Sequence, residues 1–479
     1  MNIPKENFSE WYNQIIKEAE LCDLRYNLKG FVVIMPNAAD VISRMYRLYE
    51  DALERKNHRK SYFPALISEK NLEAEKDHIE GFAPEVFWVT KAGNNELEEK
   101  MIMRPTSETA MYPMYSLWIN GKCDLPLKIY QSCQVWRYET KATKPLIRGR
   151  EFYWIETHNV FPSEESALSQ VKEDMETTEE MIHQSFGVPF IFFIRPQWDK
   201  FAGAVNTYAA DTMMPDGKAL QLPSTHNLGT NFAKVFNVKY MNDDGEEKPC
   251  WQTCYGPCIS RIFAAIVSIH GDNKGLILPF HLANVQVAVV PILKKEGSAE
   301  VVSFAEKLTK TLSKNYRVVA DFTENTPGFK YNFWELNGAA IRVEVGARDI
   351  ESGTAVVVRR DTGKKEFVPF DELPGRIGEI GKEMDKSLRE RADAWFETLQ
   401  KEADTLDELK EKIENGGGFV KVPFCTDAPE GEACAEKIKE FCSANIRGSK
   451  YGSDEKPEGK KCIVCGKDAT SYQYAARQY

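Results

Sequence analysis

The sequence has no long hydrophobic run. No apolar stretch approaches the roughly 20 residues that a helix needs to cross a bilayer. The first residues, MNIPKENFSEWY, have neither a basic start nor an apolar core, so they do not look like a secretory signal. We therefore expect a cytoplasmic protein without a membrane partner, in which the 11 cysteines stay reduced.

Positive charge is also scarce. Lys and Arg number 62 against 72 Asp and Glu, which gives a formal net charge of −10. Since general nucleic-acid binding normally shows as a basic excess, a nucleic-acid partner of this chain would need a local basic surface. The sequence also lacks an internal repeat, a low-complexity tract and an obvious Ser/His/Asp or Cys/His set.

At 479 residues the chain is too long for one hydrophobic core, so we expect two to four domains. Helical spacing runs from Phe8 to Ala19 and from Ala38 to Lys56. The stretch from His58 to Ile67 predicts a strand, which Pro64 would confine to an edge or an interface. Residues 82–89 predict another strand.

The pattern changes after residue 282. Strands alternate with helices from Val285 to Asp385, which predicts a separate α/β module. Residues from Leu388 to Ile413 follow a helical period, which the glycines at 416–418 end. We therefore expect three domains, at residues 1–282, 283–385 and 386–479.

Residues 129–161 predict an antiparallel hairpin, since two β-prone runs flank a polar loop. Charged groups are rarely buried unless they are paired or bind a ligand, yet five of them lie in or beside these strands. They are Arg137, Glu139, Arg148, Arg150 and Glu151. Arginine forks suit phosphate and carboxylate, so a polyanion such as a nucleotide is one interpretation. An ion-pair ladder on an exposed face is the other.

The tail carries a second signal. Cys462 and Cys465 form a C-x₂-C knuckle, the spacing with which thiolates chelate a tetrahedral metal. Cys425 and Cys434 could complete a structural zinc site, with Cys442 as the alternative fourth ligand. Neither a histidine nor a glutamate that could activate water stands beside the knuckle, which favours a structural site over a catalytic one.

The order of these features resembles the three motifs of class II aminoacyl-tRNA synthetases. Pro64 follows a long helix, Arg137 and Glu139 lie on a hairpin strand, and Arg261 follows the Gly256-Pro257 turn. Within that class, the strings RPTSET, PLIRGREFYW, QLPSTHNLGTNF and HGDNKGLILP resemble prolyl-tRNA synthetases of the archaeal and eukaryotic-like form. The resemblance covers nearly the whole chain.

This resemblance implies an α+β protein with three parts: an antiparallel-sheet catalytic domain, an α/β anticodon-binding domain and a small C-terminal zinc-binding α/β domain. It implies attachment of proline to tRNA(Pro) through prolyl-adenylate, with ATP and Mg²⁺, in a homodimer whose interface includes the Pro64 region. Two cations would hold the reacting anions in line, and these catalytic residues are Arg137 and Arg261.

The resemblance also assigns binding residues. For proline they are Thr106, Glu108, Arg137, Trp154, His158, Phe82, Glu85 and His226. For ATP they are Arg137, Glu139, Arg148, Phe152, Gln221, Ser224 and Arg261. Anticodon bases would meet Glu335, Arg342 and Arg348, although an ordinary salt-bridge pattern on a strand is an alternative for these three. The string TSET also suits a helix N-cap.

Three rival functions are distinguishable. A synthetase for threonine, serine or glycine fits less well, because Thr106, Glu108 and His158 match the proline pocket and no ligands for an active-site zinc are evident. A synthetase-derived protein without chemistry would be expected to lose Arg137, Arg148 or Arg261. A function as a zinc-dependent RNA-binding or scaffold protein would explain the cysteine-rich tail but would not account for the first 280 residues.

One segment that bacterial-type relatives carry is missing. Only about 90 residues separate Phe161 from Cys254, too few for the large editing insertion of those relatives. A proline pocket discriminates against smaller side chains by roughly 1–3 kcal/mol per methylene. We therefore expect misactivation of alanine and cysteine.

Overall fold

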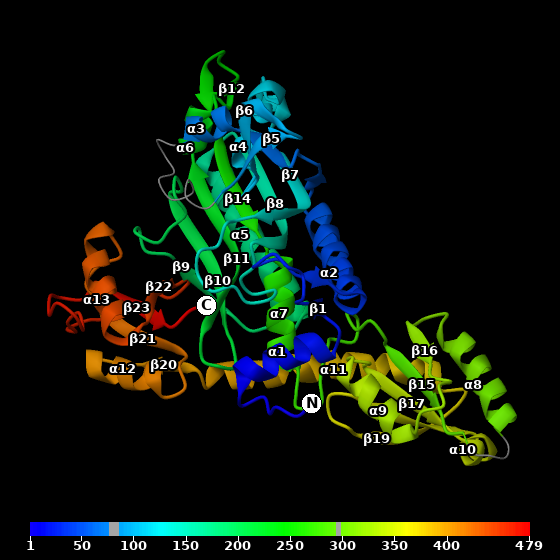
Figure 1. Cartoon of the computed structure of the whole chain (residues 1–479). Helices are drawn as coiled ribbons and strands as arrows, with labels where there is room; N and C mark the ends of the chain where they lie inside the picture. The colour runs from blue at the N-terminus through cyan, green and yellow to red at the C-terminus, as the bar shows by residue number, and fades with distance from the viewer. Residues whose placement is uncertain (76–85, 294–297) are drawn as a thin grey trace.

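The computed structural model describes residues 1–75, 86–293 and 298–479 (Figure 1). In this part of the chain the largest sheet has 11 strands, in the order β20-β21-β23-β22-β9-β10-β11-β14-β8-β7-β3. Neighbours are antiparallel except at the two edges, where β20 pairs with β21 and β3 with β7 in parallel. The strands are β3 (Arg59–Lys60), β7 (Leu127–Trp136), β8 (Glu151–Phe161), β9 (Ile191–Ile194), β10 (Asn206–Met213), β11 (Ala219–Gly229), β14 (Trp251–Gly256), β20 (Gln400–Glu402), β21 (Phe419–Phe424), β22 (Asn445–Lys450) and β23 (Ser471–Ala476).

The predicted hairpin lies in this sheet. β7 and β8 pair in antiparallel register from Leu127 opposite Val160 to Trp136 opposite Glu151, which confirms the predicted pairing. Every residue of β8 from Ile155 to Phe161 is buried. Since successive side chains of a strand point to opposite faces, both faces of the sheet are covered here.

Helices from the first 282 residues pack against the sheet. The helices are α1 (Phe8–Glu18), α2 (Pro36–Arg55), α4 (Glu108–Trp118), α5 (Glu164–Thr178), the π-helix η3 (Glu179–Ser185), α6 (Asn231–Val235) and α7 (Ile259–His270). α1 buries Phe8, Trp11 and Ile15, as its helical spacing predicts. α7 is buried almost all round, and α5 and α7 both contact β8 and β11.

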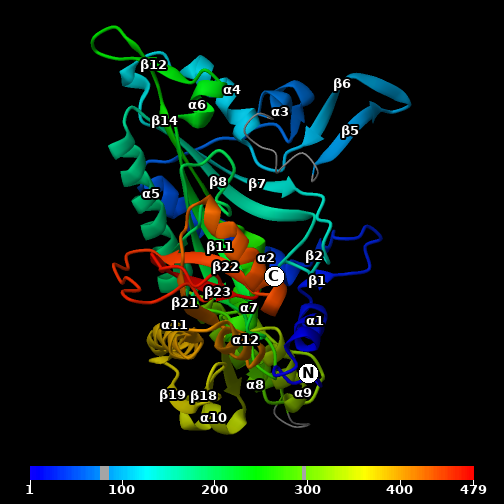
Figure 2. The ribbon, with the colours of Figure 1, turned by 90° about the vertical axis from the view of Figure 1, so that its left-hand side faces the viewer.

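Three smaller sheets complete this region. The β4-β6-β5 sheet stands beside the large sheet near its β7 edge (Figure 2). The elements are β1 (Cys22–Asp23), β2 (Val33–Ile34), β4 (Leu66–Ser68), α3 (Glu69–Glu75), β5 (Phe87–Ala92), β6 (Asn95–Met103), η2 (Lys122–Asp124), β12 (Lys239–Met241) and β13 (Glu247–Pro249).

The predicted α/β module forms a five-stranded sheet in the order β16-β15-β17-β18-β19. β16, β15 and β17 are parallel, as strands joined by crossover helices should be, and β18 and β19 are antiparallel. The elements are β15 (Val287–Pro291), α8 (Ser298–Leu312), β16 (Val318–Ala320), α9 (Pro327–Leu336), β17 (Ile341–Val345), α10 (Ala347–Ser352), β18 (Thr354–Arg359) and β19 (Lys365–Pro369).

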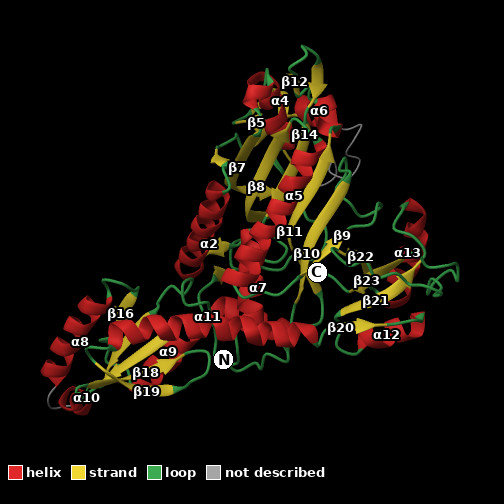
Figure 3. Ribbon diagram, turned by 180° about the vertical axis from the view of Figure 1, so that it is seen from behind, coloured by secondary structure: helices red, strands yellow, loops and turns green. Residues whose placement is uncertain are grey.

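A long helix, α11 (Leu373–Glu397), runs along the base of the molecule from this module to the C-terminal elements (Figures 1 and 3). The remaining elements are α12 (Leu406–Glu414), η4 (Pro429–Gly431) and α13 (Glu432–Cys442). The C-terminal strands extend the large sheet, because β22 pairs with β9. None of the described helices combines the length and the apolar composition that a bilayer span requires.

Two predicted elements are wrong in detail. The helical period from Leu388 to Ile413 belongs to two helices, because β20 leaves α11 to pair with β21 and Thr405 then caps α12. The predicted strand around Pro64 is two short strands, β3 and β4, with Pro64 between them, where its missing N–H breaks no ladder. The predicted boundary at residue 385 falls inside α11.

Candidate active site

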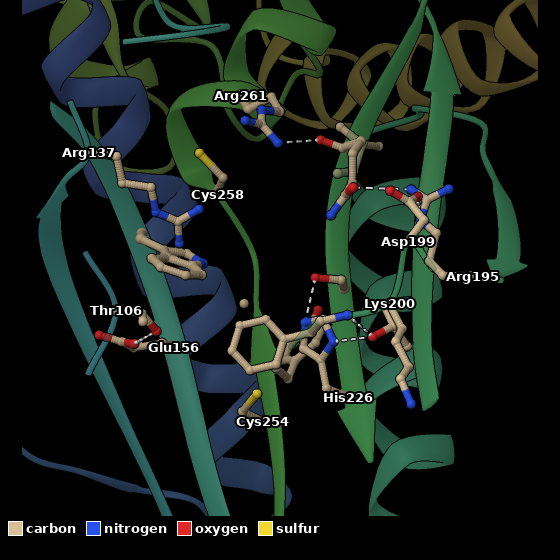
Figure 4. A pocket seen from close by; sticks show the side chains of 18 of the residues that line it. Thr106, Arg137, Glu156, Arg195, Asp199, Lys200, His226, Cys254, Cys258 and Arg261 are labelled. Carbon is tan, nitrogen blue, oxygen red and sulfur yellow. Dashed lines mark hydrogen bonds and ion pairs between the residues drawn. The ribbon is translucent and has the colours of Figure 1, made fainter. Parts of the chain in front are cut away.

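One cavity of about 370 Å³ brings together ten of the predicted site residues (Figure 4). They come from the loop before α4 and the first residue of α4, from β8, β11 and α7, and from the residue after β7. They are Thr106, Glu108, Arg137, Phe152, Trp154, His158, Gln221, Ser224, His226 and Arg261. The cavity therefore collects side chains from segments more than 150 residues apart in the sequence.

Two guanidinium groups share this cavity. Arg137 lies over the rings of Phe152 and Trp154, 5.5 and 5.1 Å from their centres, and donates to the Pro105 carbonyl at 3.0 Å. Burial and the charge of Arg261 lower the pKa of Arg137. Arg261 is held by the carbonyls of Gln221 and Ile147, at 3.1 and 3.3 Å. Two neighbouring cations aimed at one cavity suit a polyanionic ligand.

The other end of the cavity is acidic. Thr106 Oγ1 donates to Glu108 at 2.5 Å. Glu156, which sequence analysis did not single out, accepts from Ser107 N at 3.1 Å, Ser107 Oγ at 2.5 Å and Gln131 Nε2 at 2.9 Å. Ser107 occupies the N-cap position of α4, but its hydroxyl donates to Glu156 and does not cap the helix.

His158 is paired with this acidic group. Its Nε2 lies 3.1 Å from Glu156 and its Nδ1 lies 3.0 Å from the Tyr112 hydroxyl. Burial alone would lower the pKa of His158, but Glu108 and Glu156 raise it above its ordinary value. Burial alone would raise the pKa of Glu156, but hydrogen bonds from His158, Ser107 and Gln131 bring it to about 2. Each partner of this pair therefore favours the charged form of the other.

The pKa of His226 shifts in the opposite direction to that of His158. Burial, together with the charges of Arg195 and His158, lowers the pKa of His226 to about 3, so its ring is neutral. Its nitrogens lie 2.8 Å from Thr207 Oγ1 and 3.0 Å from Ser224 Oγ, and the Phe201 ring packs 4.8 Å away. The neutral His226 ring and Phe201 therefore form a partly aromatic patch beside the charged side chains of Arg195, Asp199 and Lys200.

Not every predicted residue reaches the cavity. Glu139 and Arg148 face each other at 3.7 Å, and Arg148 lines an adjacent cleft that shares Phe152 with the cavity. Phe82 and Glu85 lie outside the described residues. Ligand-type atoms of Glu108, His158 and Cys254 lie within 4.8 Å of one another. Both ring nitrogens of His158 are engaged by Glu156 and Tyr112, so the lack of ligands for an active-site zinc stays a prediction.

Several cavity residues were missed by sequence analysis. A carboxylate inside the apolar run of β8 could have indicated Glu156. No local pattern indicates Arg447 or Gln478, because they meet the cavity only after the C-terminal strands join the sheet, and Arg195 reaches it only through the pairing of β9 with β10.

Known proteins match this chain over almost its whole length. A proline–tRNA ligase of Thermofilum pendens is 48% identical over 478 residues, which cover 99% of this chain and 98% of that protein. One from Pyrococcus abyssi is 41% identical over the same shares of both proteins. The chain belongs to the prolyl-tRNA synthetase family.

Family models agree in three regions. Residues 87–270 match the class II core domain of tRNA synthetases (G, H, P, S and T), residues 286–380 an anticodon-binding domain and residues 406–479 the C-terminal domain of prolyl-tRNA synthetases. A solved Giardia lamblia prolyl-tRNA synthetase in complex with prolyl-adenylate superposes with a TM-score of 0.95, at 36% identity over 99% of both chains. The class II fold expected from the sequence is thereby confirmed.

In this prolyl-tRNA synthetase fold the tail cysteines gather. The thiols of Cys425, Cys434, Cys462 and Cys465 all lie within 4.8 Å of one another, and those of Cys425 and Cys434 are 3.7 Å apart. Cys442 is buried elsewhere and donates to the Ile438 carbonyl. Of the two alternatives for the fourth cysteine, the geometry favours Cys434.

In the anticodon-binding domain of this prolyl-tRNA synthetase fold, the predicted residues separate. Arg342 pairs with Glu335 at 2.9 Å and with Glu344 at 3.0 Å, and it lies 3.9 Å from the centre of the Tyr331 ring. Arg348 is exposed on α10. The salt-bridge alternative therefore describes Arg342 and Glu335 in this structure, and base contact by these three residues stays a prediction.

Proposed function

We propose that this chain activates proline with ATP and transfers it from prolyl-adenylate to tRNA(Pro). The observation that carries the proposal is the polarity of the cavity, with Arg261 at one end, Thr106 and Glu108 at the other, and Arg137 between them. The prolyl-adenylate of the Giardia lamblia complex has the same polarity, since it carries an imino group at one end and a phosphate toward the other.

The first step is attack of a carboxylate on the α-phosphate, which brings two anions together. Arg137, between the two ends, is placed to hold both anions and to neutralise the charge that gathers on phosphorus. Arg261 and Phe152 would hold the nucleotide from either side. Mg²⁺, when bound with the nucleotide, would supply further positive charge beside the phosphates. No side chain has to accept a proton in this step.

The imino group finds matching acceptors. A secondary ammonium has two N–H donors, and the Glu108 carboxylate and the Thr106 hydroxyl lie side by side to accept them. Glu156 already accepts hydrogen bonds from Ser107 and Gln131 and pairs with His158, so Glu108 is the carboxylate left to balance the ammonium. This charge balance supports proline over an uncharged ligand.

Amino-acid-dependent ATP–pyrophosphate exchange tests the proposal across all twenty amino acids. Proline should dominate, and Arg137→Ala should abolish the signal while leaving the thermal unfolding transition in place. Exchange that follows another amino acid, or full exchange by Arg137→Ala, would refute it.

We also propose that this protein misactivates alanine and cysteine and leaves correction to another protein. The support is that the elements between β8 and β14 are α5, η3, β9 to β11, α6, β12 and β13, which belong to the catalytic fold. A weak exchange signal with alanine and cysteine is expected, and its absence at high enzyme concentration counts against this proposal.

The four tail cysteines are proposed to hold a structural Zn²⁺. With zinc–sulfur bonds of about 2.3 Å, tetrahedral geometry places the sulfurs about 3.8 Å apart, close to the 3.7 Å between Cys425 and Cys434. The ion would link three segments of a small domain whose hydrophobic core is modest, and it would thereby stabilise the fold of that domain.

Homodimerisation and a cytoplasmic location complete the proposal. Exposed apolar side chains lie on α4 and on the segment around Pro64. They are Tyr62, Leu66, Met114, Leu117 and Trp118. The ring contact between Phe63 and Trp118 joins the two segments. Such exposure on a folded protein supports an interface.

A further inference from the structure

The C-terminal strands reach the catalytic cavity through one buried network. β22 joins β9 with Ser449 opposite Ile194. On its other side β22 pairs with β23, and the register of that pairing shifts between Ile446 and Gly448. A Cβ at Gly448 would lie 2.1 Å from the Ile194 carbonyl oxygen, so only glycine permits this approach. The preceding residue, Arg447, thereby reaches the wall of the cavity.

Arg447 shares a carboxylate with Arg195. Asp211 is fully buried and accepts from Arg447 Nε at 2.7 Å and from Arg195 Nη1 and Nη2 at 3.0 and 2.7 Å. Arg195 also donates to the Arg447 carbonyl at 2.5 Å. Burial would raise the pKa of Asp211, but the two guanidinium groups lower it. The three groups therefore form one charged, fully engaged unit.

The charged unit of Arg447, Asp211 and Arg195 contacts Gln221, on the side of the cavity that we propose binds the nucleotide. Asp211 is the cross-strand partner of Gln221, and Arg195 Nη2 donates to the Gln221 side chain at 3.1 Å. The backbone carbonyl of Gln221 in turn accepts from Arg261 at 3.1 Å (Figure 4). Arg447 of the C-terminal domain is thus linked to Arg261 of α7 by hydrogen bonds that pass through Asp211, Arg195 and Gln221.

The chain end holds Arg447 from the other side. The Arg447 guanidinium donates to Gln478, which forms a bridge with Ala219 at the start of β11. Gln478 also lines the cavity.

We propose that Arg447 is a positioning residue for the ATP side of the cavity. Through Asp211 and Arg195 it fixes Gln221, and through Gln221 it fixes Arg261. This inference rests on the proposed activation of proline by ATP in this cavity.

The test uses full-length Arg447→Met in ATP–pyrophosphate exchange. Arg195 still neutralises Asp211 in this variant, so no buried carboxylate is left unpaired. We expect the KM for ATP to rise about tenfold, with less than about a twofold change in the KM for proline. Gln478→Ala, at an exposed position, should move the KM for ATP in the same direction by a smaller factor.

Lys421→Met is the matched control, since Lys421 pairs with Glu402 and Glu455 in the same domain and does not line the cavity. It should leave both KM values unchanged. Unchanged kinetics in Arg447→Met, or an equal rise in both KM values with a matching loss of thermal stability, would overturn the inference. A wild-type chain without proline-dependent exchange would instead refute the proposed function.

Discussion

At the scale of single residues, the cavity balances its charges in pairs. Glu156 is deep, hydrogen-bonded from several sides and set against His158, whereas Glu108 has a hydroxyl beside it and the open cavity in front. The two carboxylates thus have separate tasks. Glu156 holds the Ser107 turn and the imidazole in place, and Glu108 is the carboxylate that we propose meets the ammonium of proline.

Replacing Glu108 by Gln keeps the shape of the side chain and removes its charge. The hydrogen bond to an ammonium is then no longer charge-assisted, so we expect the KM for proline to rise roughly 10- to 100-fold, with a smaller change for ATP. Exchange kinetics with each substrate varied in turn measure both. Glu98→Gln, at an exposed position on β6, is the control. A larger rise for ATP than for proline would contradict the assignment.

The His158 pair makes stability depend on pH. Because the folded-state pKa of His158 lies above its ordinary value of 6.5, protonation favours the folded state. This contribution is complete below the unfolded pKa and is lost as the pH rises through the folded-state pKa. As the pH rises above about 6.5, urea midpoints of the wild type should therefore fall more than those of His158→Gln. Equal pH dependence in the two proteins would contradict this prediction.

At the scale of elements, the fit of β14 against β8 shapes the cavity. Trp154 of β8 lies against Gly256 of β14, and a Cβ at Gly256 would lie 2.5 Å from the indole ring. Both residues line the cavity. The glycine is therefore required by the close approach of a large side chain.

We expect Gly256→Ala to push Trp154 into the cavity and to raise the KM for proline about tenfold. Tryptophan fluorescence should change with it, although nine tryptophans share that signal. Gly375→Ala on α11, where a Cβ would meet no atom within 4 Å and the backbone φ is not positive, tests whether any glycine change has this effect. Proline kinetics that do not change in Gly256→Ala would argue against a wall formed by Trp154.

The four-cysteine cluster joins β21, α13 and the loop after β22. We expect one zinc ion per chain in metal analysis of the purified protein, and loss of most of it in Cys434→Ser. Cys442→Ser should keep its zinc, since Cys442 lies apart from the cluster. The reverse outcome would make Cys442 the fourth ligand.

At the scale of the whole molecule, the exposed apolar side chains on α4 and near Pro64 predict a dimer. Leu117 is 68% exposed and Phe367, in the anticodon-binding domain, is 72% exposed. We expect Leu117→Glu to shift the wild-type dimer toward monomer in sedimentation velocity, and Phe367→Glu to leave it unchanged. Dissociation by Phe367→Glu alone would place the interface elsewhere.

The sequence by itself determined the parts that depend on local pattern. The spacing of Phe8, Trp11 and Ile15 is sufficient for α1, and the two β-prone runs around one loop are sufficient for the β7–β8 hairpin. Such signals lie within one element, where periodicity and turn chemistry act. Which side chains share the cavity, among them Thr106, Arg137 and Arg261, was predicted only through the resemblance of their motifs to a known family.

Only the tertiary structure decided the contacts between distant segments. The pairing of β22 with β9 brings Arg447 to Asp211 across 236 residues, and the folding of the tail selects Cys434 over Cys442. It also broke the helical period after Glu397, where β20 pairs with β21. The physical reason is that a buried ion pair or a metal site gains its energy from groups that meet only once the chain has folded, so no short stretch of sequence contains it.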